Sequence, residues 1–187
     1  MNAEVPNAEM VLADPTNYHA RPLLQILRGA YDLIVIHVTS GHGDPYGTAS
    51  MWQRPDNKTS AHFVIGQSGK VLQCVPLRYA AQHAHEANTY SVGVEHCARE
   101  PREFGPADPG LPPSSEQYLA SAKLVAYLCK AAGLPPTRET IQGHAEADPQ
   151  TTHSGCPLAA GWNWELYMQL VGDEYRKLEN GQAPQIG

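Results

Sequence analysis

The sequence has no CxxC pair, no cluster of Lys and Arg, and no run of about 20 consecutive apolar residues. Its four cysteines, at positions 74, 97, 129 and 156, are widely and irregularly spaced, which argues against a disulfide framework. A formal net charge of -6 without a basic patch excludes a nucleic-acid partner. The missing long apolar run excludes a membrane span.

The amino terminus also lacks the basic region and apolar stretch of a signal peptide, so we expect the chain to be cytoplasmic as synthesised. The 187 residues suffice for one domain, and 16 Gly and 16 Pro predict many turns. We therefore predict a single domain over residues 1–187. Its core would run from about 15 to 178, with a lead-in at 1–14 and a tail at 179–187. A monomer is expected, and the residues leave the oligomeric state open.

Several segments have the patterns of strands and helices. Residues 33–38 (LIVIHV) form an apolar, β-branched run typical of a central strand. Residues 61–65 and 70–75 flank a Gly-rich turn and predict a hairpin. In the strand predicted at 91–95, Val92 and Val94 alternate with Ser91, Gly93 and Glu95.

Two helices are predicted near the carboxyl terminus. One follows the capping sequence SSEQ at 114–117 and ends at Gly133, and the other spans 164–178 with Asn163 as its cap. A helical turn is expected near 48–53, and a short extended piece at 140–142. Strands separated by helices in one small domain indicate an α/β fold with a mixed sheet.

Three of these segments carry candidate metal ligands. His37 lies near the end of the first strand, His144 follows the extended piece, and Cys156 precedes Pro157 in the next loop. Imidazole and thiolate are favoured zinc ligands, and a catalytic site has three of them and one open position. Cys74 and Cys129 lie in strand and helix patterns and are interpreted as core residues.

Four segments, LIVIHVTSG, SAHFVIGQSGKVLQCV, SVGVEHC and QGHAEADPQTTHSGCP, resemble in order and spacing the zinc-dependent N-acetylmuramoyl-L-alanine amidases. That family includes small phage amidases and animal peptidoglycan recognition proteins. The resemblance covers about residues 15 to 171. It implies an α/β domain with a central mixed sheet flanked by helices and one zinc ion in a groove at one side.

The resemblance implies His37 and His144 as the first two zinc ligands. The third ligand in the family is Asp or Cys, often followed by Pro, and Cys156 fits best. It lies twelve residues after His144, a longer spacing than usual, so His153 is a rival third ligand.

Further roles follow from the same resemblance. Glu95 matches the general base, and His153 or Ser154 matches a polar group that stabilises the tetrahedral intermediate. Ala61 replaces a Tyr of some phage members, which leaves more of the proton transfer to Glu95.

The resemblance also implies a set of substrate-binding residues. They are His62, His83 (in a WHAG-like segment), Asn88 and Ser154. Ser91 and Gly93, on the same strand face as Glu95, are expected to leave room for substrate.

The predicted activity is zinc-dependent hydrolysis of the amide between N-acetylmuramic or anhydromuramic acid and L-alanine, with peptidoglycan or muropeptides as partner. One alternative is a peptidoglycan-binding module without catalysis. Another is an amidase of the same fold that acts on a different amide, since specificity resides in loops. The sequence leaves three questions open: whether the enzyme recycles muropeptides or lyses the wall, whether it prefers polymer or small fragments, and which type of stem peptide it accepts.

Overall fold

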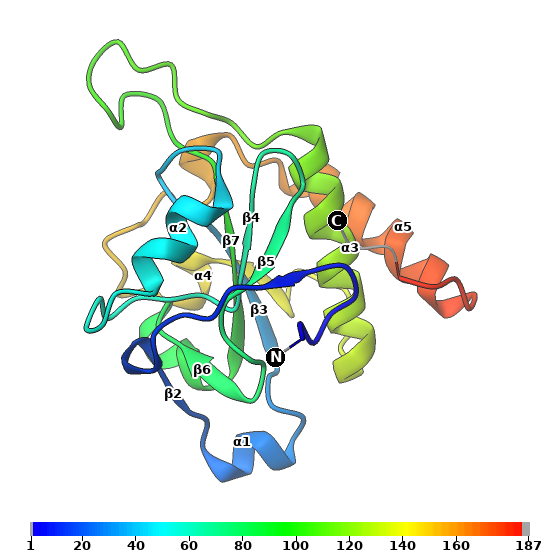
Figure 1. The fold of residues 1–187 in the computed structure, drawn as a ribbon. Helices are drawn as coiled ribbons and strands as arrows, with labels where there is room; N and C mark the ends of the chain where they lie inside the picture. The colour runs from blue at the N-terminus through cyan, green and yellow to red at the C-terminus, as the bar shows by residue number, and fades with distance from the viewer. Residues whose placement is uncertain (1, 185–187) are drawn as a thin grey trace.

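A six-stranded mixed sheet runs through the centre of the molecule in the order β1-β5-β4-β7-β3-β8 (Figure 1). The structure is a computed structural model and describes residues 2–184. The strands of this sheet are β1 (Glu9–Met10), β3 (Leu33–Val38), β4 (Phe63–Ile65), β5 (Val71–Gln73), β7 (Ser91–His96) and β8 (Ile141–Gly143). A second sheet pairs β2 (Tyr18–Ala20) with β6 (Tyr79–Ala81).

The middle of the large sheet is parallel, because β4, β7, β3 and β8 all run in one direction. β5 is antiparallel to β4 and forms the expected hairpin, while β1 extends the edge parallel to β5. The central strand β3 has the predicted bounds. The α/β domain with a mixed sheet that the sequence predicted is thus confirmed.

Two long helices, α3 (Ser115–Ala132) and α5 (Trp164–Glu179), cover one face of the sheet (Figure 1). The Ser114 hydroxyl caps α3 by accepting from the Gln117 N–H at 3.0 Å, and Asn163 caps α5 in the same way. Gly133 ends α3 at a φ of 67°, a left-handed conformation that suits glycine. In the described residues, no helix has both the length and the apolarity required to cross a bilayer.

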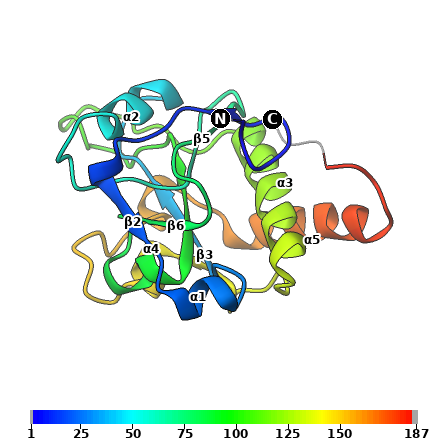
Figure 2. The ribbon, with the colours of Figure 1, turned by 60° about the horizontal axis from the view of Figure 1, so that its bottom comes forward.

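The opposite face of the sheet carries α2 (Pro45–Trp52), and Figure 2 shows this helix on the far side of the strands from α3 and α5. Alternation along β7 sends Val92 and Val94 into the core beneath α3 and α5. In the parallel register His37 pairs with Glu95, so these two side chains leave the sheet next to each other on the α2 face.

Several short elements were not expected from the sequence. These are β1, β2, β6, a 3₁₀ helix at Pro15–Asn17, another at His85–Thr89, a third at Leu158–Ala160, and the helices α1 (Leu23–Leu27) and α4 (His144–Ala147). Much of the predicted lead-in at 1–14 packs against the domain, because Val5 and Ala13 are buried and β1 is part of the sheet. Of the predicted tail, residue 179 ends α5, and 185–187 lie outside the described residues, as does residue 1 of the lead-in.

A buried arginine, Arg21, binds the backbone from just before β6 to the first residue of β7. The residue is 3% exposed, and its guanidinium has no carboxylate partner among the described ion pairs. It donates instead to four backbone carbonyls, at distances from 2.7 to 3.2 Å, which belong to Leu77, Asn88, Thr89 and Ser91. Bonds from a charged donor are among the stronger ones, so Arg21 fixes the path of this segment.

We expect Arg21→Met to lower the free energy of unfolding by at least about 3 kcal/mol, because it leaves several buried carbonyls without a donor. Urea unfolding followed by circular dichroism measures the change. Arg28→Met is the matched control, since Arg28 is exposed, and a change within about 0.5 kcal/mol is expected there. Equal losses in the two variants would contradict the structural role of Arg21.

Candidate active site

A pocket of about 580 Å³ opens at the carboxyl ends of β3 and β7, the edge at which open α/β sheets bind ligands. Its walls come from these two strands, from α2, from the segment around His83 and from the loop between α4 and the 3₁₀ helix at Leu158–Ala160. The lining includes these side chains with catalytic chemistry: His37, His83, Glu95, Glu100, His144, His153, Ser154 and Cys156.

Three of the lining residues, His37, His144 and Cys156, form a cluster that could hold a metal ion. One ligand atom from each lies within 4.8 Å of the other two. Because zinc bonds to nitrogen and sulfur are about 2.0–2.3 Å long, small side-chain adjustments would let all three bind one ion. His153 is not part of this cluster, so the geometry favours Cys156 over its rival.

The fold brings these three residues together from distant parts of the sequence. β3 and β8 are neighbours in the sheet, with Ile36 paired to Gly143, so the ends that carry His37 and His144 lie side by side. The Val38 N–H donates to the Cys156 Sγ at 3.4 Å and ties the third residue to β3.

The ionisation of the cluster suits a cation. Burial and the neighbouring His83 hold the pKa of His37 well below its usual range, and burial also lowers the pKa of His144. Both imidazoles are therefore neutral and can donate a lone pair to a metal. Burial and the nearby Glu95 raise the pKa of the Cys156 thiol to about 12, so a bound cation would have to displace its proton.

Glu95 lies beside this cluster and lines the pocket. Its Oε2 atom is buried and has no hydrogen-bond partner in the described part of the chain. Burial raises the pKa of the carboxyl group to about 8. An unpartnered buried carboxylate next to a His, His, Cys cluster fits a site in which a metal ion and a water complete the set of partners.

The Asp148 carboxylate lies beside the His144 ring, a contact that was not predicted from the sequence. Its side chain is 4% exposed, and its Oδ2 lies 3.6 Å from the His144 Nε2 and within hydrogen-bond distance of the His85 Nδ1. The Gln150 N–H donates to the other oxygen at 3.2 Å. Carboxylates commonly orient metal-binding histidines in this way. The spacing of four between His144 and Asp148 placed both on one helix face and was a usable signal.

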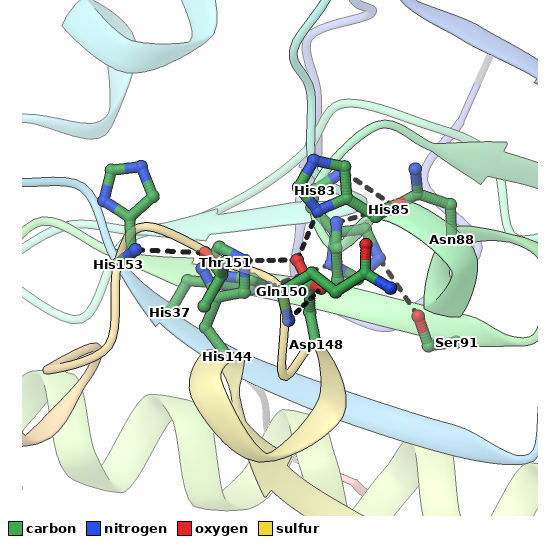
Figure 3. Close-up of polar contacts among 11 residues, drawn as sticks. His37, His83, His85, Asn88, Ser91, His144, Asp148, Gln150, Thr151 and His153 are labelled. Carbon is green, nitrogen blue, oxygen red and sulfur yellow. Dashed lines mark hydrogen bonds and ion pairs between the residues drawn. The ribbon is translucent and has the colours of Figure 1, made fainter.

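The structure also places the other residues for which roles were predicted. His153 and Ser154 are exposed on the pocket wall, and the His153 ring stacks on His144 with centroids 5.7 Å apart. His83 lines the pocket and contacts His37 (Figure 3).

Two of the predicted substrate-binding residues do not reach the pocket. His62 is fully buried, where its Nδ1 accepts from the Gly93 N–H and its Nε2 lies 3.0 Å from the Tyr79 carbonyl. Asn88 is likewise absent from the lining, and its Oδ1 accepts from the N–H groups of His83 and Ala84. The contacts of His62 and of the Asn88 Oδ1 are thus made within the protein, and a role of either residue in substrate binding stays a prediction.

The space expected beside Ser91 and Gly93 is also filled by protein. A Cβ atom on Gly93 would lie 2.7 Å from the His83 Cγ, so the imidazole occupies the room that glycine leaves. The Ser91 hydroxyl contacts the same ring. The substrate therefore has no access to this part of β7.

Comparison with known proteins gives a consistent result. The family model described as N-acetylmuramoyl-L-alanine amidase matches residues 27–158. N-acetylmuramoyl-L-alanine amidase A of Achromobacter lyticus is 32% identical over 102 residues, which are 54% of this chain and 52% of that protein. The chain thus spans about half the length of this curated relative.

Solved structures share the fold. The catalytic domain of XlyA superposes with a TM-score of 0.66 at 18% identity, covering 89% of this chain and 99% of that one. A selenomethionine derivative of AmpD gives a TM-score of 0.64 at 19% identity, with 91% and 98% covered. The catalytic domain of PlyG gives 0.64 at 20% identity, with 90% and 94% covered.

Proposed function

The chain belongs to the N-acetylmuramoyl-L-alanine amidase family, and we propose that it hydrolyses the amide between the muramic acid lactyl group and L-alanine. The substrate is peptidoglycan or a soluble muropeptide, including anhydromuramic forms. One zinc ion is held by His37, His144 and Cys156. The observation that carries this proposal is the cluster of these three residues beside the unpartnered carboxylate of Glu95.

The metal and the carboxylate have complementary tasks. Bound zinc supplies Lewis acidity, which polarises a carbonyl and lowers the pKa of water to about 7. Glu95 accepts the proton of the attacking water and transfers it to the leaving L-alanine nitrogen. Burial alone raises the pKa of Glu95 to about 8, and a neighbouring cation lowers it again, so the carboxylate is ionised and able to accept.

The exposed loop residues complete the site. His153 and Ser154 lie on the pocket wall next to His144, where a donor would face the oxyanion that develops on the lactyl carbonyl. Their exposure leaves the side chains free to adjust to substrate. We assign His153 the main stabilising role and Ser154 a substrate contact.

Mass spectrometry of muropeptides tests the proposal. Purified anhydromuramyl and muramyl peptides, and separately intact wall polymer, are incubated with the protein, with a chelator, and with chelator followed by excess zinc. We expect free stem peptide with a new L-alanine amino terminus, lost with the chelator and restored by zinc. Comparing the two kinds of substrate shows whether fragments or polymer are preferred.

Two negative results would separate the alternatives. Stoichiometric bound zinc without any cleaved product would indicate an amidase of this fold that acts on another amide. Neither zinc nor product, combined with retention on wall polymer, would favour a binding module. The His37→Ala variant, purified in parallel, controls for contaminating hydrolases, because it should release no stem peptide.

A further inference from the structure

His83 forms the middle of a chain of hydrogen bonds that begins at a metal-ligand candidate (Figure 3). The His37 Nε2 lies 2.9 Å from the His83 Nδ1. The His83 Nε2 lies 3.1 Å from the Ser91 Oγ, which in turn lies 2.6 Å from the Ala87 carbonyl oxygen. The chain thus runs from the end of β3 to the 3₁₀ helix at His85–Thr89.

The positions of the protons in this chain follow from donor and acceptor chemistry. A carbonyl oxygen only accepts, so the single hydroxyl proton of Ser91 is donated to Ala87. Ser91 must then accept from the His83 Nε2–H. A neutral imidazole carries one N–H, so the His83 Nδ1 is an acceptor, and the His37 Nε2 donates to it. The lone pair of His37 is left on Nδ1.

We propose that His83 is a positioning residue that, with Ser91, fixes His37 as the Nε2–H tautomer and so presents its Nδ1 atom to the metal. This inference rests on the metal site proposed above. Second partners of this kind set both the tautomer and the ring orientation of metal-binding histidines. His83 therefore acts through His37 and not through the substrate.

The surroundings of His83 leave its ring little freedom. On one side the ring packs on Gly93, where any Cβ atom would come within 2.7 Å of its Cγ. The Asn88 Oδ1 accepts from the backbone N–H of His83 at 2.9 Å and from that of Ala84 at 2.7 Å. A ring fixed by packing and by its backbone can impose a tautomer on its neighbour.

Proton-detected ¹H–¹⁵N spectra tuned to two-bond couplings identify imidazole tautomers directly. We expect the zinc-loaded protein, labelled with ¹⁵N-histidine, to show His37 bound through Nδ1 and protonated at Nε2. His83 should be neutral and protonated at Nε2. Coordination of zinc by the His37 Nε2, or a proton on the His83 Nδ1, would overturn the proposal.

Matched variants test the same idea by zinc affinity. His83→Phe keeps an aromatic ring but removes the acceptor, and we expect zinc to bind about 10- to 100-fold more weakly. His83→Asn carries an oxygen close to the position of the original Nδ1, and we expect it to recover most of the lost affinity. Competition with a chromophoric chelator measures both constants, and Co²⁺ absorption spectra report any change in coordination.

The outcomes separate this inference from the proposed function. If His83→Phe binds zinc as tightly as the unaltered protein, His83 does not position the ligand, although the amidase proposal stands. If the unaltered protein binds no zinc, the metal site and the positioning role both fail. If His83→Phe does not fold, Ser91→Ala can be used instead. This change removes only the hydroxyl that accepts from the His83 Nε2–H. If the His37 tautomer and the zinc affinity are both unchanged in Ser91→Ala, the proposal is refuted.

Discussion

Replacing Cys156 with serine should weaken zinc binding by at least about 100-fold. A thiolate is a strong zinc ligand, whereas a serine hydroxyl stays protonated near neutral pH and binds poorly. Only His37 and His144 would then remain of the cluster. Competition with a chromophoric chelator gives the dissociation constant, and metal analysis after dialysis gives the occupancy. Hydrolysis of muropeptides should fall with the occupancy.

His153→Ala is the matched control for this prediction, because His153 is the rival ligand by sequence but lies outside the cluster. It should keep full zinc occupancy and lose only part of the turnover. Cys129→Ala controls for the loss of a thiol elsewhere, since Cys129 is buried in α3. Full occupancy in Cys156→Ser together with loss in His153→Ala would move the third ligand to His153.

The parts of the fold that could be predicted from sequence are those with strong local signals. The buried run of β3 has an unbroken apolar pattern, and α3 and α5 have caps that can be read from Ser114 and Asn163. Short strands lack such signals. β1 has two residues, and it exists because it pairs with β5, 63 residues further along the chain. Its formation depends on tertiary contacts, which no local pattern contains.

The same limit explains which site residues were located and which were not. His37, Glu95 and His144 lie at or near strand ends, where the topology of a parallel sheet gathers side chains at one edge, so the family resemblance was enough to name three residues that line one pocket. The burial of His62 depends on Arg21 and on the backbone of Gly93 and Tyr79, which are distant in sequence. A resemblance of motifs identifies a residue but does not say which way its side chain faces.

Asp148 and Ser91 illustrate a different omission. Neither belongs to the ligand cluster, yet Asp148 lies within ion-pair distance of His144, and Ser91 is linked to His37 by hydrogen bonds through His83. Such partners need only the right atom at the right distance, so many residue types can serve and no motif marks them. Geometry is needed to find them.

Replacing Glu95 with glutamine should leave zinc bound and reduce kcat by about 10²- to 10⁴-fold, the usual contribution of a general base. The amide has the shape of the carboxylate but cannot accept the water proton. Because burial already raises the pKa of Glu95 to about 8, the neutral side chain should not destabilise the fold. Metal analysis measures whether zinc stays bound, thermal unfolding measures the stability of the fold, and single-turnover hydrolysis of a muramyl peptide measures the rate of the reaction.

Glu100→Gln is the matched control, because Glu100 is a second acidic residue of the pocket lining and is not part of the proposed proton transfer. Its kcat should stay within a few-fold of the unaltered protein, so a large loss confined to Glu95→Gln cannot come from a general change in pocket charge. A proton acceptor for this reaction has to lie beside the metal. Glu95 meets this requirement because it is paired with His37 in the sheet. Near-normal turnover by zinc-loaded Glu95→Gln would remove this residue from the reaction.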